Sequence, residues 1–323
     1  MNKFLSIIEN IRSEHVYIQT HNFPDPDAIA SAYGLSMLLK EYGIDSSICY
    51  RGKIERYCTT GLVTSLDIEM KAIEGLHDMA CEDEVILVDS QKGNANVIDT
   101  DGDEIICIDH HSTFESSAGS KYRFADIRPE VGACSTIIAE YYFLNNVEVD
   151  VKVATALVYG IFSDTMGLSR DVSDLDVDMY GKLYKIADKK ILKSLEHCSI
   201  RFDELKAYSN AINSIKVYDQ LSFANTGTDC QEGLIASICD FMLDIVEVTF
   251  SVVYSIKKDG IKLSVRSSGE YNAGKIANKA LDGIGSGGGH QSMAGGFVPI
   301  DSGCDIDSLI IDIENRFLSV ISE

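Results

Sequence analysis

The sequence predicts an α/β fold: a doubly wound parallel sheet in the N-terminal part, joined by a helical connector to a smaller α+β domain. Strand-like and helix-like segments alternate through the first half of the chain. EVILVDS (84–90) and EIICIDHH (104–111) are short continuous apolar runs, typical of central parallel strands buried on both faces. The C-terminal third is rich in strand patterns. We expect domain limits at 1–180, 181–216 and 217–323.

The remaining N-terminal elements follow from hydrophobic periodicity. Two further apolar strands are expected at 15–22 and 46–50, and a less regular helical stretch follows the second to about residue 80. Helices are predicted at 1–15, 27–43, 132–146 and 151–165. Strands that alternate with helices in this way imply right-handed crossovers within one parallel sheet.

The C-terminal part begins after a helical, charged region at 174–216, which contains the connector. Strand patterns follow at 216–226, 246–269 and 293–300, and Lys-Asp-Gly at 258–260 predicts a hairpin turn. GIGSGGGH (283–290) departs from ordinary composition. One interpretation of this run is a flexible turn between a helix and a strand.

Charge and cysteine usage narrow the functional class. The 323 residues include 28 Lys and Arg against 50 Asp and Glu, for a net charge of −22. This weakens the case for a protein that tracks long DNA or RNA, since phosphate neutralisation requires many basic side chains. A small phosphorylated substrate is not excluded. The nine cysteines contain no C-x-x-C pair, which argues against a disulfide framework or a structural zinc site.

The expected location is the cytoplasm, with no membrane partner. The first residues lack the long apolar segment of a signal peptide, and no window is apolar enough to span a bilayer. Scattered cysteines in apolar runs are typical of reduced, buried thiols in this compartment.

Acidic and imidazole side chains follow several of the predicted apolar segments. They are His21, Asp25, Asp27, Asp89, Asp109, His110, His111 and Asp164. Because ligands bind beyond the carboxyl ends of the strands in open parallel sheets, these side chains are expected at one edge. A single Asp after a strand is most often a cap or turn residue, and Asp27 could simply cap the helix it precedes.

Clustered carboxylates at a buried edge would repel one another and lose solvation. No Lys or Arg lies in these short segments to offset the negative charge. Bound cations would neutralise the carboxylates directly. Carboxylate and imidazole ligands without cysteine suit Mn²⁺, Mg²⁺, Fe²⁺ or Co²⁺, and Zn²⁺ remains an alternative. Since the candidates exceed what one ion needs, we expect two ions about 3.5–4 Å apart that share a carboxylate.

These residues resemble the motifs of the DHH family of phosphoesterases. HNFPDPDAIAS (21–31) resembles the first motif, LVDS (87–90) the second, DHH (109–111) the third and FSDT (162–165) the fourth. SVRSSG and GGGHQSMAGG resemble the DHHA1 domain, the C-terminal partner in one subfamily. Pro26 stands where family members often have glycine or another small residue, but it keeps the spacing.

The resemblance implies a role for each matching residue. His21 and Asp25 would bind one ion; Asp27, His110 and Asp164 would bind the other; Asp89 would bridge them. Asp109 would orient the neighbouring histidine, and His111 would face the scissile phosphate as a donor or proton source. The implied substrate-binding residues are Arg266, His290, Gly288, Gly289 and, more loosely, Arg170. Taken alone, Arg266 could equally be an exposed strand residue.

The implied activity is phosphoester hydrolysis by water activated between two divalent ions, most often Mn²⁺, with Mg²⁺ or Co²⁺ as alternatives. The implied substrates are short: nanoRNA, as in an oligoribonuclease, 3′-phosphoadenosine 5′-phosphate (pAp), or cyclic di-AMP and its linear product pApA. Long duplex DNA is not expected as a partner, and a homodimer is possible.

Three alternatives stay open. One is a RecJ-like exonuclease on single-stranded DNA. Another is an inorganic pyrophosphatase or polyphosphatase, although the Ser-Arg-Lys-Lys signature of the pyrophosphatase second domain is not found. The third is a nucleotide sensor without catalysis, which the loss of a metal ligand would favour. All the expected ligands are present.

Overall fold

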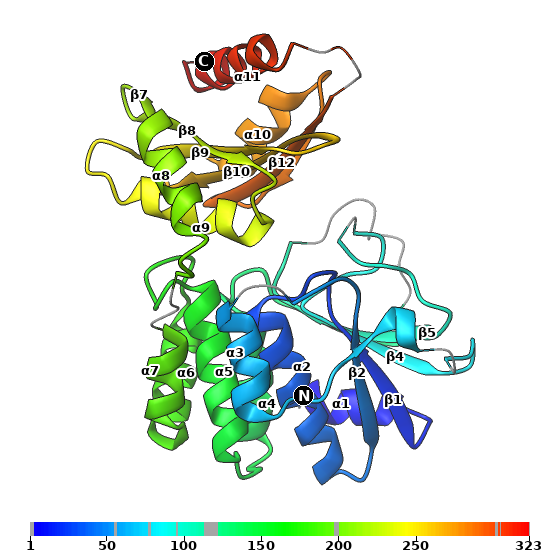
Figure 1. The fold of residues 1–323 in the computed structure, drawn as a ribbon. Helices are drawn as coiled ribbons and strands as arrows, with labels where there is room; N and C mark the ends of the chain where they lie inside the picture. Colours follow the sequence, from blue (N-terminus) through cyan, green and yellow to red (C-terminus); the bar gives the residue numbers. More distant parts are fainter. Residues whose placement is uncertain are drawn as a thin grey trace. The chain divides into compact units, whose positions relative to one another are not determined.

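A computed structural model describes residues 3–54, 57–76, 79–94, 96–112, 122–196, 200–300, 303 and 305–322. The chain divides into two compact units, Met1–Ser199 and Ile200–Glu323 (Figure 1). The division falls inside the predicted connector, so part of that helical region belongs to each unit. Each unit is described by itself.

The first unit contains a six-stranded, all-parallel sheet. Its strands are β1 (His15–Gln19), β2 (Asp45–Tyr50), β3 (Lys71–Ala72), β4 (Glu84–Val88), β5 (Asp103–Asp109) and β6 (Phe124–Ile127). The order β3-β2-β1-β4-β5-β6 confirms the predicted doubly wound sheet, with its reversal between β1 and β4. In such sheets the crevice at the reversal, beyond the carboxyl ends of the strands, is where ligands bind.

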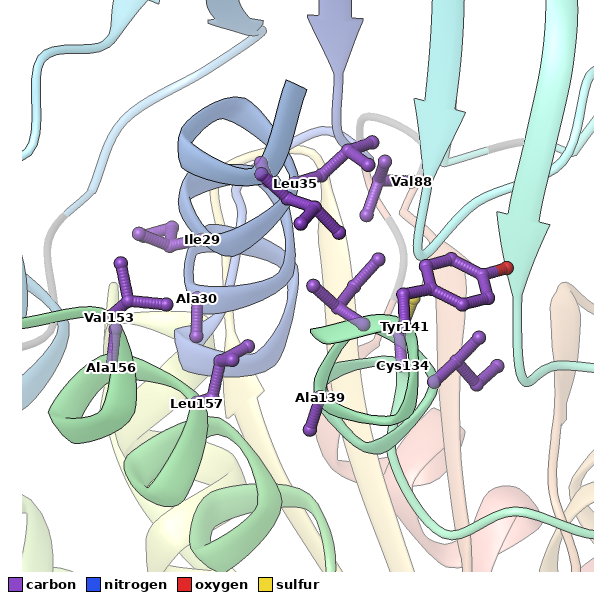
Figure 2. Close-up of a cluster of buried hydrophobic side chains, with 14 of the residues drawn as sticks. Ile29, Ala30, Leu35, Val88, Cys134, Ala139, Tyr141, Val153, Ala156 and Leu157 are labelled. Carbon is purple, nitrogen blue, oxygen red and sulfur yellow. The ribbon is translucent and has the colours of Figure 1, made fainter. Parts of the chain in front are cut away.

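Helices of the first unit pack beside this sheet. They are α1 (Lys3–Asn10), α2 (Pro26–Glu41), α3 (Tyr57–Leu66), α4 (Cys134–Leu144), α5 (Val151–Asp164), α6 (Asp174–Ile186) and α7 (Lys189–Glu196). Figure 2 shows buried side chains between α2, α4 and α5, among them Ala30, Ala139 and Leu157. Gly34 permits this close packing, because a Cβ there would lie 3.0 Å from a methyl group of Leu157. The core therefore fixes α2, α4 and α5, whose ends carry predicted site residues.

Two predictions for the first unit were incomplete. The helical stretch expected to about residue 80 ends at Leu66, and β3 and a 3₁₀ turn (η1, Ile73–Gly75) follow. Asp67 ends the helix, since its backbone adopts a left-handed φ of 53°. Strand β6 was missed because four residues, FADI, are too few to show a period.

The second unit is a mixed sheet with helices. Its strands are β7 (Lys216–Tyr218), β8 (Leu221–Thr228), β9 (Phe250–Ile256), β10 (Gly260–Ser267), β11 (Ser286–Gly289) and β12 (Met293–Pro299). They lie in the order β11-β12-β10-β9-β8-β7, and only the β8–β9 pair is parallel. Its helices are α8 (Leu205–Ser214), α9 (Glu232–Leu243), α10 (Ala273–Leu281) and α11 (Ile306–Ser322).

The predicted hairpin turn connects β9 and β10, closed by a 2.7 Å bond from the Lys257 N–H to the Gly260 carbonyl. The glycine-rich run is a strand, not a flexible turn: residues 286–289 form β11, paired with β12. Gly287 lets it pack on α10, because a Cβ there would lie 2.6 Å from the Ala277 carbonyl oxygen.

The cysteines that the structure describes as free number seven, and all except Cys81 are buried. Burial raises the pKa of the Cys134 thiol well above its usual value, so that thiol stays protonated at neutral pH. Among the helices in the described ranges, none combines the length and apolar character needed to cross a membrane.

Candidate metal centre

His21 and Asp25 lie on either side of the turn that follows β1. The Nδ1 atom of His21 lies 2.9 Å from the carbonyl oxygen of Asn22. Its Nε2 atom faces two carboxylates, 3.8 Å from Asp25 Oδ1 and 3.6 Å from Asp89 Oδ2. Asp25 is the N-cap of α2 and accepts a 3.0 Å hydrogen bond from the N–H of Ala28. Its second oxygen is not needed for capping.

Asp27 is completely buried in the first turn of α2. It accepts hydrogen bonds from the N–H groups of Cys134, at 2.7 Å, and Ser135, at 2.9 Å. These groups begin α4, whose own N-cap residue Ala133 makes no side-chain cap bond. Thus Asp25 caps α2, whereas Asp27 caps α4 from a neighbouring helix. This bond fixes the Asp27 carboxylate at the carboxyl edge of the sheet.

Asp89 directly follows β4 in a left-handed backbone conformation, with φ of 56°. That conformation is strained for a residue other than glycine, and such strain concentrates at functional sites. A 2.9 Å bond from the Asp89 N–H to the Ile108 carbonyl holds the turn. It places the buried carboxylate between two imidazoles, 3.6 Å from His21 Nε2 and 3.4 Å from His110 Nε2.

Asp109 ends β5 and organises the two histidines that follow it. Its Oδ1 atom accepts bonds from the N–H groups of His110, at 2.8 Å, and His111, at 3.2 Å. The same oxygen lies 2.8 Å from His111 Nδ1. Burial opposes ionisation of Asp109, but its bond to His111 and the charge of the neighbouring histidines lower its pKa. Asp109 therefore positions side chains as a buried carboxylate.

His110 turns one ring nitrogen toward the backbone and the other toward three carboxylates. Its Nδ1 atom lies 3.2 Å from the Val131 carbonyl oxygen, which requires the proton on that nitrogen. Its Nε2 atom lies 3.2 Å from Asp164 Oδ2, 3.4 Å from Asp89 Oδ1 and 4.0 Å from Asp27 Oδ2. In the neutral ring, a lone pair would face these oxygens, so a cation belongs between them.

Among the residues that the structure describes, three sets could each hold a metal ion with ligand atoms within 4.8 Å of one another. They are His21, Asp25 and Asp89; Asp27, His110 and Asp164; and Asp89, His110 and His111. The first two sets bring together the six side chains that the resemblance implies as ligands. Asp89 contacts a histidine of each, as a bridging ligand would.

Two buried atoms in the middle of the cluster lack hydrogen-bond partners in the described parts of the chain. They are Asp89 Oδ1 and His110 Nε2. Buried polar atoms are nearly always paired, and an unpaired one costs about 1–3 kcal/mol. A divalent cation coordinated by both atoms would satisfy them, and the oxygen and nitrogen donors suit Mn²⁺ or Mg²⁺.

The electrostatics of the cluster favour added positive charge. Burial raises the pKa of Asp27 well above its usual value, and the carboxylates of Asp89 and Asp164 raise it further. Burial likewise raises the pKa of Asp89. Burial opposes the charged form of His21, but Asp25 and Asp89 raise the pKa of that imidazole to about 10. Either protons or metal ions must compensate this density of carboxylates.

Arg170 and His111 lie at the margin of the cluster. Arg170 donates a 3.0 Å hydrogen bond from Nη2 to the Asp164 carbonyl oxygen. His111 is one-quarter exposed, and its Nδ1 atom is held by Asp109. Burial opposes the charged form of His111, but Asp109 and Asp89 raise its pKa, which suits a proton donor. Their roles toward a substrate stay predictions.

The predicted substrate residues of the second unit are in ordered positions. Arg266 on β10 is not an exposed strand residue: its side chain is 11% exposed, and Nε donates a 2.6 Å bond to Asp240 Oδ1 on α9. His290 follows β11, and its N–H donates a 2.7 Å bond to the Met293 carbonyl. The backbone φ of 153° at Gly289 is one that favours glycine. A Cβ on Gly288 would meet no atom within 4 Å. The open space beside Gly288 is compatible with close approach of a ligand, and phosphate binding stays a prediction.

Gln91 is a site residue that the sequence did not indicate. It is 1% exposed. Its Nε2 atom donates to Asp109 Oδ2 at 2.8 Å and to the His111 carbonyl at 3.0 Å. Only its place two residues after Asp89 could have signalled this role, and an amide does not stand out in a search for titratable groups.

Comparison with known families identifies both parts of the chain. Residues 15–161 match the DHH family, N-terminal domain, and residues 216–313 match the DHHA1 domain. The chain thus carries a DHH-family domain followed by a DHHA1 domain. The predicted family and its order of domains are therefore confirmed.

The relatives differ in how much of this chain they match. An uncharacterised protein of Methanocaldococcus jannaschii is 32% identical over 295 residues, 90% of this chain and 59% of that protein. The cyclic-di-AMP phosphodiesterase PdeA of Listeria monocytogenes is 25% identical over 88% of this chain and 44% of its own. A probable manganese-dependent inorganic pyrophosphatase of Bacillus cereus is 31% identical over 54% of this chain and 56% of its own. The chain thus spans about half the length of these curated relatives.

Solved structures share the fold. An exopolyphosphatase-related protein of Bacteroides fragilis aligns with a TM-score of 0.78 at 18% identity, over 98% of this chain and 96% of its own. RecJ of Thermus thermophilus in complex with Mn²⁺ aligns with a TM-score of 0.59 at 13% identity, over 99% of this chain and 55% of its own. These likenesses support the DHH architecture.

Proposed function

We propose that this chain is a metal-dependent phosphoesterase that hydrolyses short nucleotide substrates. The observation that carries the proposal is the convergence of six His and Asp side chains in two sets, with Asp89 of the first set 3.4 Å from His110 of the second. Asp89 Oδ1 and His110 Nε2 are buried and lack hydrogen-bond partners among the described residues. The DHH-family domain supports the same reaction class.

The ligand set fits two divalent ions. His21 and Asp25 would hold one; Asp27, His110 and Asp164 would hold the other; Asp89 would contact both. When bound, such ions lower the pKa of a coordinated water to about 7 and neutralise phosphoryl oxygens. We propose Mn²⁺ as the preferred ion, because relatives are named as manganese-dependent and the RecJ structure contains Mn²⁺.

The protein groups then have separate tasks. Asp109 holds the His111 ring through Nδ1, which leaves Nε2 to donate to the substrate phosphate or to protonate the leaving oxygen. Gln91 fixes Asp109 from the other side. The guanidinium of Arg266, oriented by Asp240, would bind a substrate phosphate together with His290.

Short nucleotides are favoured over the alternatives by the extent of the matches. The phosphodiesterase PdeA matches 88% of this chain, whereas the Bacillus cereus pyrophosphatase matches 54%. A net charge of −22 also disfavours RecJ-like binding of long single-stranded DNA. We therefore rank pApA, cyclic di-AMP, pAp and nanoRNA ahead of pyrophosphate.

A substrate panel tests this proposal. The chain is incubated with Mn²⁺ and, separately, pApA, cyclic di-AMP, pAp, a short RNA and pyrophosphate. Release of nucleotide or phosphate from the nucleotide substrates is expected, and chelation of the metal should abolish it. Hydrolysis of pyrophosphate alone would favour the pyrophosphatase alternative. No hydrolysis of any substrate by metal-loaded protein would favour a nucleotide sensor.

Asp89→Asn tests the shared ligand. We expect turnover to fall by at least about 10³-fold, because both ions lose a common negative ligand. The melting temperature should not fall, since a strained buried carboxylate is being neutralised. Retained turnover would remove the bridging role from Asp89.

Arg266→Ala tests whether the second unit binds a substrate phosphate through this guanidinium. The expected result is a KM increased about 10-fold or more with a smaller change in kcat, since a charge-assisted bond is worth about 1.5–3 kcal/mol. Lys262→Ala, on the same strand and paired with Glu232, is the matched control. Equal kinetics for both variants would count against the role of Arg266.

A further inference from the structure

Phe23 is an exposed aromatic residue in the middle of the first metal-binding motif. It lies two residues after His21 and two before Asp25. Its side chain is 67% exposed. Single exposed apolar side chains are common and need no explanation by themselves. The conformation of Phe23 and its immediate neighbours set it apart.

The backbone of Phe23 is held in an unfavourable conformation. Its φ is 55°, in the left-handed region that bulky residues rarely adopt. Two short backbone hydrogen bonds fix the loop there: Phe23 N–H to the Arg51 carbonyl at 2.7 Å and Asn22 N–H to the Asn96 carbonyl at 2.6 Å. An aromatic residue in such a position, where glycine or asparagine would be less strained, indicates that its ring has a use.

The ring of Phe23 is supported on one side by Gly52. A Cβ at Gly52 would lie 2.6 Å from two ring carbons of Phe23, so that position has no room for a side chain. Gly52 itself has a φ of 94°, which favours glycine. The ring therefore packs on bare backbone, while most of its surface faces solvent.

We propose that Phe23 is a stacking platform for a nucleobase of the substrate. This inference rests on the proposed function and deepens it, since it names the part of the substrate that distinguishes a nucleotide from pyrophosphate. In a nucleotide, one sugar separates the base from the phosphate, and in the chain Phe23 is two residues from each of two proposed ligands, His21 and Asp25. Stacking on an aromatic ring tolerates any base, which fits a site for short nucleotides of mixed sequence.

A cycle of protein and substrate changes tests the platform. Wild type, Phe23→Ala and Phe23→Tyr are compared on pApA and on the same dinucleotide with both bases removed. On pApA, Phe23→Ala should lower kcat/KM by about 5- to 150-fold, the range for loss of one base–aromatic stack. On the abasic substrate that penalty should vanish, and Phe23→Tyr should behave as wild type on both.

Binding of a fluorescent product gives a readout that does not depend on turnover. 2-Aminopurine riboside 5′-monophosphate is titrated with the protein in Mg²⁺. Wild type and Phe23→Tyr should quench its emission through stacking, whereas Phe23→Ala should quench weakly and bind about 5-fold or more weakly. Tyr184→Ala, which removes another exposed aromatic ring, on α6, is the matched control and should bind as wild type.

The outcomes separate this inference from the proposed function. If wild type hydrolyses pApA but Phe23→Ala loses equally on the intact and abasic substrates, the platform is wrong and the proposed function stands. The same conclusion follows if Phe23→Ala loses nothing on pApA. If wild type hydrolyses none of the nucleotides in the substrate panel, the proposed function fails, and this inference fails with it. Melting temperatures distinguish a misfolded variant, and Phe23→Leu, which keeps apolar bulk without an aromatic ring, then replaces Phe23→Ala in the same comparison.

Discussion

Asp89 and Gln91 show how the turn after β4 combines charge with rigidity. The left-handed turn at Asp89 aims its carboxylate at two histidines, and Gln91 reaches from the same turn to Asp109. Gln91 is a positioning residue in this arrangement, since it touches neither proposed ion. Its own Oε1 atom is buried and has no hydrogen-bond partner in the described parts of the chain. The Gln91 side chain therefore binds Asp109 and the His111 carbonyl through Nε2 while its own carbonyl oxygen has no partner there.

Gln91→Met should reduce kcat by about 10- to 100-fold, as expected when a group that orients a catalytic residue is lost. Metal content should stay unchanged. Stability should fall by about 1–3 kcal/mol, because the buried carboxylate of Asp109 loses a donor, and removal of the unpaired Gln91 carbonyl offsets this only in part. Steady-state kinetics, metal analysis and urea denaturation measure the three effects.

Combining Gln91→Met with Asp109→Asn provides the control. If Gln91 acts through Asp109, the double variant should be no slower than the slower single variant. Multiplicative losses would show that Gln91 acts by another route.

The ligand residues were predictable because their types and spacing carry the chemistry. Histidines and aspartates after apolar strands indicate a metal site at one sheet edge, and the motifs assign the ions. The partners that orient them were not predictable. These partners are backbone groups, which sequence patterns do not reveal. They are the N–H groups of Cys134 and Ser135 and the carbonyl of Val131.

The contact between α5 and the start of α4 positions Asp27. Gly160 on α5 lies there: an added Cβ would meet Ser135 Oγ at 2.2 Å and Asp27 Oδ1 at 3.1 Å. No flexible side-chain end relieves this overlap, since Ser135 and Asp27 are both completely buried. Glycine at this position therefore permits the bond that fixes the Asp27 carboxylate.

Gly160→Ala should destabilise the protein by about 1–3 kcal/mol, the usual cost of overpacking a core, and should lower metal affinity. Gly181→Ala is the matched control. It replaces a helical glycine on α6 whose Cβ would meet no atom within 4 Å, so it should stabilise by about 0.5–1 kcal/mol. Denaturation and metal titration measure both, and similar effects of the two variants would contradict this role for Gly160.

Asp126 on β6 binds α4 through a buried charge network. It pairs with Arg128 at 2.6 Å and accepts a 2.7 Å bond from the Tyr141 hydroxyl. Burial opposes ionisation of Asp126, but Arg128, Lys3 and Tyr141 lower its pKa below the usual value. Because the folded pKa is the lower one, this stabilisation is complete above the unfolded pKa of about 3.9 and disappears as pH falls through the folded value.

Asp126→Asn should therefore cost about 2–3 kcal/mol at pH 6, and the difference from wild type should shrink below about pH 4. Urea denaturation at pH 6, 4 and 3 measures it. The raised carboxylates of the metal cluster are common to both proteins, so their titration cancels in the difference. A difference that does not change with pH would exclude linkage to Asp126.

Helices and strands with a clear period were predictable, and short ones were not. The 14-residue helix α5 and the apolar strands β4 and β5 emerge from their patterns. Strand β3, with two residues, shows no period. The sequence of strand β11 predicts a loop, because glycine has low strand propensity. Pairing with β12 makes this segment extended.

The charge of the whole chain gives a further expectation. A protein that grips 6–10 phosphates loses about 10³–10⁵ in affinity between about 50 and 200 mM salt. With a net charge of −22, this chain should show a much weaker dependence: kcat/KM for pApA should fall less than about 10-fold over that range. Tight, steeply salt-dependent binding of a long single-stranded DNA would instead favour the RecJ-like alternative.

The order of the domains and the doubly wound sheet were predictable because motif order and alternation are properties of the sequence. The strand order was not, since it depends on which apolar faces pair in three dimensions. That order has a functional consequence: the reversal lies between β1 and β4, and these are the strands that deliver His21 and Asp89.

Metal content measured on the intact chain tests the central claim directly. The protein is stripped with chelator, loaded with Mn²⁺, freed of excess metal and analysed for manganese and by electron paramagnetic resonance. Two Mn²⁺ per chain with a spin-coupled spectrum are expected, and Asp89→Asn should lose the coupling. Fewer than two ions, or two ions with uncoupled spectra in wild type, would contradict a shared pair held by these six side chains.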